Sequence, residues 1–230
     1  MSINTVRAID DLVAVKTVLV SVADKTGLES LVKGLLAANP RCKILSTGGT
    51  HAEIARILGP RAADCLSQVS AYTGQPEMQG GLVKTLDYKI YLGLLSETYK
   101  SAHQEDLRRF GASQIDMVVS SLYPFQQTVS RVGCTAESAR GNIDIGGPCM
   151  VRAAAKNFHR VTAVTDPADY REVVSELAAR GGSLCLATRF RLAQKAFGLI
   201  AGYDAAISRY LADLSFETMS ACYSIKNKAR

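Results

Sequence analysis

The stretch "IDIGGPCMVRAAAKN" (residues 143–157) combines a carboxylate, a turn without side chains and two cations. Asp144 stands before two glycines, which permit backbone conformations and close approaches that a side chain would block. Pro148 suits the first position of a helix, where its missing N–H is not needed. Asn157 is a residue type that commonly ends a helix. The stretch therefore predicts a strand or loop, a tight turn and a short helix.

Two interpretations of this stretch stay open. Arg152 and Lys156 are four residues apart and share one helix face, where cations near the C-terminus balance the helix dipole. That interpretation needs no ligand. In the other, the free N–H groups of the turn bind an anion or stabilise an oxyanion.

A second candidate site is the stretch "STGGT" (46–50), which supplies hydroxyls and backbone N–H groups directly before an expected helix. Such a loop can cradle a phosphate, and Lys25 in "SVADKTG" (21–27) would add the countercharge. A plain strand-to-helix turn also uses Ser, Thr and Gly. Neither the Walker A pattern nor G-x-G-x-x-G is present here, so a phosphate monoester is favoured over ATP or a dinucleotide.

Four titratable residues are candidates for chemistry, and each has a structural alternative. Lys84 could be a surface cation, Tyr123 a core ring, Asp144 a helix cap and Lys156 a dipole partner. Their joint placement in loop stretches favours catalysis. A Lys–Asp pair can transfer protons, and a lysine with a lowered pKa can act near neutral pH.

The elements that must position these residues alternate between strand and helix along the chain. Apolar runs and helical spacing predict strand–helix units over 16–40, 43–60 and 160–182, and a strand over 115–125. From Thr188 onward the apolar residues recur at intervals of three or four residues, which predicts one long amphipathic helix or a helix pair over 188–214. This order predicts an α/β fold with a mainly parallel sheet and helices on both faces. Ligands in such sheets bind beyond the carboxyl ends of the strands.

Composition narrows the class of protein. The chain has 230 residues, of which 47% are hydrophobic and 21% charged, with a net charge of +6, as expected for a globular protein with a sizeable core. The basic residues are dispersed and aromatics reach only 7%, so we expect no nucleic-acid partner. Six cysteines without a C-x-x-C pair and three histidines make a zinc site improbable. No apolar run is long enough to span a membrane, and a reducing cytoplasm fits best.

The motifs "SVADKTGL", "STGGT", "TGQPEMQGG", "VKTL", "LYPF", "IDIGGP" and "RAAAKN" occur in one order. In order and spacing they resemble the IMP cyclohydrolase domain. That domain is the N-terminal half of the bifunctional purine biosynthesis enzyme that also carries AICAR transformylase. The resemblance runs from about Val15 to Leu211, so we expect residues 1–230 to form a single domain of this kind.

The resemblance implies a fold like methylglyoxal synthase, a three-layer α/β sandwich with a helical C-terminal part. It also implies an enzyme, a hydrolase acting on cyclic amidines. The substrate would be FAICAR, a formylated purine-precursor nucleotide, which closes its ring and loses water to give IMP. No metal or organic cofactor is implied. The expected partners are a second copy of the chain in a homodimer and a transformylase domain or protein.

The motifs also imply roles for single residues. The N–H groups of Ile145 and Gly146 would form an oxyanion hole for the developing formyl oxygen. Asp144 and Lys156 would manage the protons, and Lys84 would stabilise charge or protonate the leaving oxygen. Tyr123 completes the expected catalytic set. The remaining substrate-binding residues, with the 5′-phosphate held by Lys25 and the "STGGT" loop, are Ser21, Lys25, Ser46, Gly48, Gly49, Thr50 and Thr85.

Several positions depart from the family pattern. The family usually has G-G-R-V-K-T-L-H-P where this chain has "GGLVKTLDY", and an asparagine where this chain has Ser121. The replacements in the first motif are Leu82, Asp87 and Tyr88, and Tyr91 stands where a further histidine is common. A leucine in place of an arginine removes a charged hydrogen-bonding fork. The phosphate end is thus kept, and the end expected to recognise the base is altered.

These departures keep two alternatives open. One is a specialised paralogue that closes a ring on a related ribonucleotide, for instance in nucleoside-antibiotic synthesis. The other is a catalytically silent sensor of a phosphate ligand, against which the four retained catalytic-type residues argue.

Overall fold

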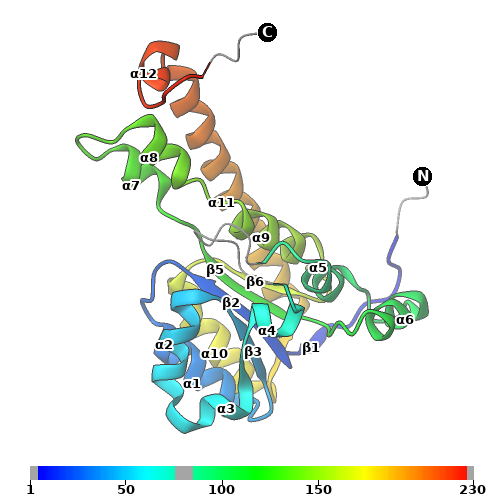
Figure 1. Cartoon of the computed structure of the whole chain (residues 1–230). Helices are drawn as coiled ribbons and strands as arrows, with labels where there is room; N and C mark the ends of the chain where they lie inside the picture. Colours follow the sequence, from blue (N-terminus) through cyan, green and yellow to red (C-terminus); the bar gives the residue numbers. More distant parts are fainter. Residues whose placement is uncertain (1–4, 76–84, 227–230) are drawn as a thin grey trace.

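The structure is a computed structural model that describes residues 5–75 and 85–226 (Figure 1). A body built around a sheet holds most of the chain. A helical extension, here called the distal lobe (residues 125–141 and 203–220), projects from one end of the body. The chain therefore has an elongated shape.

The sheet of the body has five strands in the order β4-β3-β2-β5-β6, and every neighbouring pair is parallel. Central β2 is buried on both faces, because Val18 and Val20 point to one side and Leu19 to the other. The predicted α/β fold with a mainly parallel sheet is confirmed. The strands are β2 (Thr17–Val22), β3 (Lys43–Ser46), β4 (Leu66–Gln68), β5 (Met117–Ser121) and β6 (Thr162–Val164).

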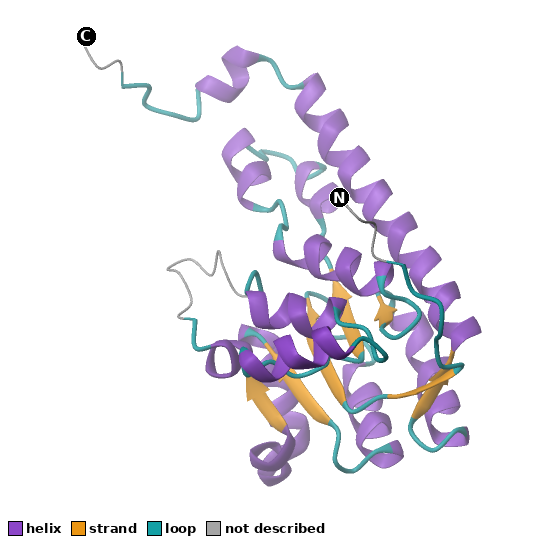
Figure 2. Cartoon of the chain, turned by 90° about the vertical axis from the view of Figure 1, so that its right-hand side faces the viewer, coloured by secondary structure: helices purple, strands orange, loops and turns teal. Residues whose placement is uncertain are grey.

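Helices cover both faces of the sheet, which gives the three-layer sandwich (Figure 2). The helices are α1 (Leu28–Ala38), α2 (Gly48–Leu58), α3 (Ala62–Cys65), α4 (Val69–Thr73), α5 (Tyr88–Leu95), α6 (Ser101–Arg109), α7 (Phe125–Val129), α8 (Ala136–Gly141), α9 (Gly146–Lys156), α10 (Tyr170–Ala179), α11 (Leu186–Asp213) and α12 (Phe216–Ser220). One core cluster joins β2 to α1, α2 and α10. A second joins the other face to α4, α5, α9 and α11.

A two-stranded antiparallel sheet, formed by β1 (Leu12–Ala14) and β7 (Ser183–Cys185), was not predicted. Next to it, the guanidinium of Arg189 is fully buried and donates to five backbone carbonyl oxygens. The acceptors are Asp10, Asp11, Phe158, His159 and Leu184, at 2.5–3.1 Å. Since a buried charge is costly unless its donors are satisfied, this residue ties the N-terminal segment to α11 and to the residues before β6.

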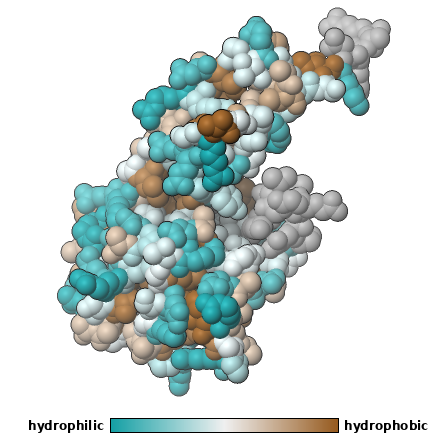
Figure 3. Space-filling model, turned by 90° about the vertical axis from the view of Figure 1, so that its left-hand side faces the viewer, coloured by the Kyte–Doolittle hydropathy of each residue, from teal (hydrophilic) through white to brown (hydrophobic). Residues whose placement is uncertain are grey.

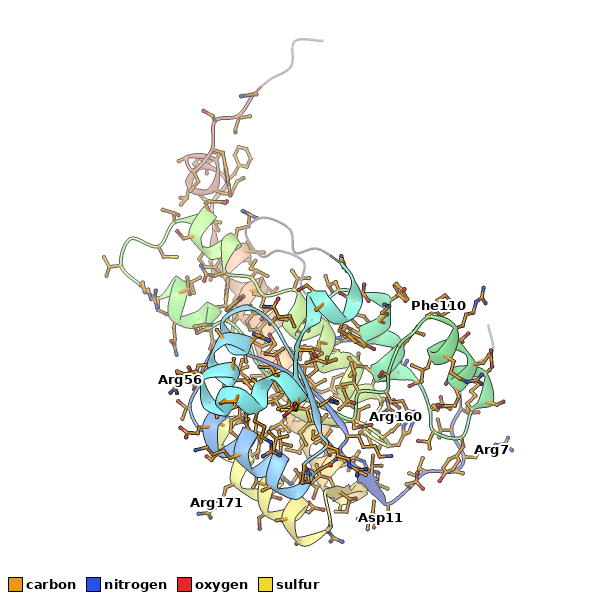
Figure 4. The ribbon with its side chains drawn as sticks, turned by 60° about the horizontal axis from the view of Figure 1, so that its bottom comes forward. Arg7, Asp11, Arg56, Phe110, Arg160 and Arg171 are labelled. Carbon is orange, nitrogen blue, oxygen red and sulfur yellow. The ribbon has the colours of Figure 1, made fainter. Side chains whose placement is uncertain are left out.

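A second buried arginine joins β5 to the layer of α5 and α9. Arg160 forms an ion pair of 3.2 Å with buried Asp116 and also donates to the Ser96 carbonyl at 2.9 Å. Figure 4 shows Arg160 inside the body, whereas Arg56 and Arg171 lie at its surface. The two buried arginines therefore hold parts of the scaffold together.

The residues predicted as a long helix or a helix pair form one continuous helix, α11, followed by the short α12. At 1.5 Å per residue its 28 residues span about 42 Å. It begins in the body and ends in the distal lobe, where α7 and α8 lie beside it (Figure 1). A third apolar cluster, around Phe125, Ala139 and Ala206, holds the lobe together. No helix in residues 5–75 and 85–226 is long and apolar enough to cross a membrane.

Candidate active site

A cavity of about 640 Å³ opens between the carboxyl ends of the strands and the base of the distal lobe. Its walls come from five segments, 21–25, 47–50, 85–86, 121–123 and 141–147. Ligand cavities in proteins typically measure ~300–1,000 Å³, so a nucleotide fits in size. Figure 3 shows the side of the molecule on which the body narrows into the lobe. Most residues on this side are hydrophilic or of intermediate hydropathy.

The strand order explains why the cavity forms there. From β2 the chain moves outward through β3 and β4, and it then returns to the other side of β2 as β5 and β6. The connections beyond β2 and β5 therefore leave in opposite directions and a crevice opens between them. Ser21, Val22 and Ser121, at the ends of these two strands, line the cavity.

The ammonium group of Lys25 is fixed on one side of the cavity by neighbouring oxygens. Its Nζ lies 3.2 Å from Thr50 Oγ1 and donates to the Val22 carbonyl oxygen. Burial lowers the pKa of Lys25, and the nearby Glu53 and Asp24 carboxylates oppose this. A cation held by carbonyl and hydroxyl oxygens, beside free backbone N–H groups, is suited to an anionic ligand.

Helix α2 begins earlier than predicted. The "STGGT" stretch was predicted as a loop before the helix, but Gly48, Gly49 and Thr50 form the first turn of α2. Gly48 has a φ of +43°, a left-handed conformation that favours glycine. Within the described residues, the N–H groups of Gly48 and Gly49 have no hydrogen-bond acceptor. The helix N-terminus therefore faces the cavity with two free donors.

Ser46 was predicted to bind the phosphate, and the structure does not bring it to the cavity. Its side chain is fully buried, and its hydroxyl donates to the Val20 carbonyl oxygen at 2.8 Å. Thr47 lines the cavity instead, 3.1 Å from the Ser21 hydroxyl. The reason is the alternation of side chains along β3, which turns consecutive residues to opposite sides. Applied to the end of the predicted strand, this alternation would have identified Thr47.

Asp144 lies on the opposite wall of the cavity, half-buried, in the turn before α9. Its Oδ1 accepts a hydrogen bond from Gly147 N at 2.9 Å. Burial raises the pKa of the Asp144 carboxyl, and hydrogen bonds from the backbone of Gly147 and Tyr123 oppose that rise. A carboxyl group whose pKa lies above its ordinary value is suited to accepting and returning protons.

The N-terminus of α9 leaves two donors free beside this carboxylate. Within the part of the chain that the structure describes, the N–H groups of Ile145 and Gly146 have no acceptor. A Cβ at position 146 would lie 2.8 Å from Thr85 Oγ1, so only glycine lets the buried Thr85 approach the turn this closely. Both N–H groups lie in the cavity wall and could bind an oxyanion.

Of the predicted catalytic residues, Tyr123 and Asp144 both line the cavity. The side chain of Tyr123 is 51% exposed, which rules out the alternative of a core ring. The residues predicted to bind substrate that line the cavity are Ser21, Lys25, Gly48, Gly49, Thr50, Thr85, Ile145 and Gly146. Lys84 lies outside the described residues.

Lys156 is exposed at the last position of α9, whereas Asp144 precedes the first. Ten residues of helix separate Gly146 from Lys156, which is about 15 Å at 1.5 Å per residue. The structure therefore does not support the predicted pairing of Asp144 with Lys156 within one chain. The cause is the helix itself, which runs away from the cavity.

The departures from the family pattern divide into two groups. Asp87 caps α5, because its Oδ1 accepts from Lys89 N at 2.8 Å, and Tyr88 packs edge-on against Phe110 with ring centres 5.8 Å apart. Neither residue lines the cavity, and nor does Tyr91. Ser121 does line it, and its hydroxyl accepts a hydrogen bond from Asp24 N at 3.1 Å. Leu82 lies outside the described residues.

Two cavity residues carried no signal in the sequence analysis, Gly141 and Asn142 at the end of α8. Tyr203, on α11, does not line the cavity but accepts a hydrogen bond from Asp144 N at 2.8 Å. The apolar periodicity of this segment predicted only that Tyr203 lies on a helix. Its contact with Asp144, 59 positions away in sequence, depends on tertiary structure.

Comparisons with known proteins agree with this geometry. Residues 27–149, more than half of the chain, match the family model of the MGS-like domain. Residues 154–230 match the model of the AICARFT/IMPCHase bienzyme. The two matches meet within α9.

Two individual proteins are similar over most of the chain. The bifunctional purine biosynthesis protein PurH of Magnetococcus marinus is 47% identical over 203 residues, which cover 88% of this chain and 37% of PurH. The chain thus spans little more than a third of that relative's length. The crystal structure of ForH has a TM-score of 0.69 and 29% identity to this chain, and the match covers 85% of this chain and 96% of the ForH chain.

Proposed function

We propose that this chain, which belongs to the MGS-like domain family, catalyses ring closure of FAICAR to IMP with loss of water. One observation carries the proposal. Two helix N-termini face one cavity, α2 with free N–H groups beside Lys25, and α9 with free N–H groups beside Asp144. The first arrangement suits a phosphate and the second suits a reaction that develops negative charge on oxygen. The likeness to a bifunctional purine biosynthesis protein supports this assignment.

In the proposed reaction the carboxamide nitrogen of FAICAR attacks the formyl carbon. A carbon–nitrogen bond forms, and the formyl oxygen becomes negatively charged. Two protons then pass from the two nitrogens that flank this carbon to the oxygen, the carbon–oxygen bond breaks, and water leaves. The ring gains a C=N bond and the product is IMP.

The residues of the cavity divide these tasks in the proposal. The N–H groups of Ile145 and Gly146 stabilise the developing oxyanion, with the dipole of α9 behind them. The Asp144 carboxylate takes a proton from the attacking nitrogen and returns it to the leaving oxygen, a transfer that its raised pKa favours. The exposed Tyr123 hydroxyl orients the reacting groups. By the family motif, Lys84 would stabilise charge or protonate the oxygen.

A turnover assay tests the proposal. Purified protein is mixed with FAICAR, and formation of the purine ring is followed by absorbance, with Asp144→Asn as the control. We expect wild-type turnover and a loss of on the order of 10²–10⁴-fold in the variant. Wild-type protein that binds FAICAR without closing its ring would overturn the enzyme assignment and favour the phosphate-ligand sensor.

A second candidate is a paralogue that closes a ring on a related ribonucleotide. One observation favours it. Ser121 stands at the cavity wall, where the family has an asparagine. If Ser121 selects the base, Ser121→Asn raises FAICAR turnover about tenfold, while Asp87→His, at a helix cap outside the cavity, does not. Efficient wild-type turnover that Ser121→Asn leaves unchanged would contradict this candidate.

We further propose that the chain works beside a transformylase domain or protein, in the manner of the bifunctional relative, and forms a homodimer. Sedimentation of the purified chain at several concentrations tests the second point.

A further inference from the structure

The distal lobe contacts the candidate site at the end of α8 and, from α11, through one hydroxyl. Tyr203 lies on α11 at the base of the lobe, and its OH accepts a hydrogen bond from Asp144 N at 2.8 Å. The two residues are 59 positions apart in sequence. The turn that carries the Asp144 carboxylate is thereby connected to the long helix.

The hydrogen bond from Asp144 N to Tyr203 differs from the other hydrogen bonds that the amides of the turn donate. The N–H groups of Asn142 and Ile143 bond to carbonyl oxygens at the end of α8. Gly147 N bonds to the Asp144 carboxylate, so that bond is internal to the turn. In the described part of the chain, Ile145 and Gly146 have free N–H groups. The Tyr203 hydroxyl is therefore the one acceptor outside the 136–147 segment that receives an amide from the turn.

The hydroxyl is itself held in place by packing. The ring of Tyr203 contacts Phe125 of α7 edge-on, with ring centres 6.2 Å apart and planes at 67°. Both residues belong to the apolar cluster of the lobe. Burial also raises the pKa of Tyr203, which favours the neutral phenol. The acceptor is thus fixed in position and in protonation state.

We propose that Tyr203 is a positioning residue for the reaction, which holds the Asp144 carboxylate and the free N–H groups of Ile145 and Gly146 in reactive geometry. This inference rests on the proposed function. It also assigns a role to the distal lobe, which fixes the ring of Tyr203 and so fixes the turn. Sub-ångström placement of such groups has a large effect on rate.

The chain offers a matched control on the same helix. Tyr210 lies seven residues further along α11 and packs edge-on against the same Phe125, with ring centres 5.7 Å apart. In the described residues its hydroxyl makes no hydrogen bond. Tyr203→Phe and Tyr210→Phe therefore both remove one hydroxyl and keep the ring packing, and only the first removes a bond to the turn.

We expect Tyr203→Phe to lower kcat about tenfold or more with KM changed less than about threefold, and Tyr210→Phe to change neither. A tenfold loss in kcat corresponds to about 1.4 kcal/mol in the barrier. In the Asp144→Asn background, Tyr203→Phe should cost little more, because the group it positions is already gone. Equal effects of the two tyrosine variants, or an unchanged kcat in Tyr203→Phe, would overturn the proposal.

A second measurement does not depend on turnover. Hydrogen exchange resolved by peptide should show faster exchange over residues 142–147 in Tyr203→Phe than in wild type, and no change in Tyr210→Phe. If the wild type fails to close the ring of FAICAR but the exchange result holds, the proposed reaction is wrong and the positioning contact stands. Unchanged exchange in Tyr203→Phe contradicts the contact itself.

Discussion

The Asp144 carboxylate occupies the space where a side chain at Gly147 would lie. A Cβ at position 147 would come within 2.5 Å of Asp144 Oδ2, and Gly147 N donates to Asp144 Oδ1 at 2.9 Å. The second glycine of the "IDIGG" motif thus serves the acid before it, through one hydrogen bond and one absent side chain.

Gly147→Ala should therefore lower kcat, by roughly 10–100-fold, because the carboxylate must shift to make room for the methyl group. The added methyl group would also come within 2.8 Å of Leu122 Cδ2, so some loss of stability is expected as well. Gly198→Ala is the matched control, since an added Cβ there meets nothing within 4 Å. A Gly147→Ala enzyme at full rate would show that the carboxylate has no fixed role.

The phosphate assignment predicts a difference between a nucleotide and its nucleoside. IMP at a hundredfold excess over its Kd should stabilise the protein by about 2.7 kcal/mol. For a chain of this size that is a rise in Tm of roughly 5–10 °C, and inosine should give much less. Lys25→Met should remove most of the difference, whereas Lys33→Met, which loses only an exposed helix ion pair with Glu29, should not. Equal shifts from IMP and inosine would contradict a phosphate site.

Lys156→Ala should have a small effect on kcat, within about threefold. The backbone of Lys156 lies about 15 Å along α9 from Gly146 at the cavity wall, a separation at which exposed charges are largely screened. Combined with Asp144→Asn, its effect should simply multiply, as for distant sites. A loss of on the order of 10²-fold in Lys156→Ala would mean that the lysine reaches a cavity from another copy, and mixing the two single variants would then restore activity.

Stability should depend on pH through Asp144. Burial raises its pKa in the folded protein, so the folded state holds the proton more tightly than the unfolded state does. The ionised carboxylate lowers stability above the folded pKa, and this loss disappears as the pH falls below the ordinary value of about 4. Asp144→Asn should raise Tm at pH 7, by roughly 2–4 °C for each kcal/mol gained in the free energy of unfolding. In acid, the Tm of the variant should approach that of the wild type.

The exposed Asp64, replaced by asparagine, is the control for that experiment. At pH 7 it should give a Tm close to that of the wild type. A lower Tm of Asp144→Asn at pH 7 would show that the hydrogen bonds from Gly147 and Tyr123 outweigh the cost of burial.

Much of the fold was predictable because the main strands and helices have local sequence patterns. The apolar run of β2 and the helical spacing in α1 are properties of short windows. The turn-rich loops were predictable for the same reason, and most of them do meet at one cavity. Ser46 was misassigned because the strand continues one residue further than the loop motif indicates, which turns its hydroxyl into the sheet.

Other features depended on tertiary geometry. The pairing of Asp144 with Lys156 looked plausible because only twelve positions separate them in sequence. Helix α9 lies between them and places them far apart in space. Tyr203 and Asp144 are the opposite case, because they are far apart in sequence and the fold brings them into contact. The short β1–β7 sheet joins segments about 170 residues apart and has no local signature at all.

The buried Arg189 has a consequence for where the chain can be shortened. Two of its five acceptors are the carbonyl oxygens of Asp10 and Asp11, in an extended segment that otherwise resembles a dispensable tail. A chain trimmed to begin at β1 would leave guanidinium donors buried without acceptors, and β1 itself would lose its anchor. Tolerance to truncation follows the bonds of the removed backbone rather than its position. The minimal folding unit therefore includes these residues, although they belong to no helix or strand.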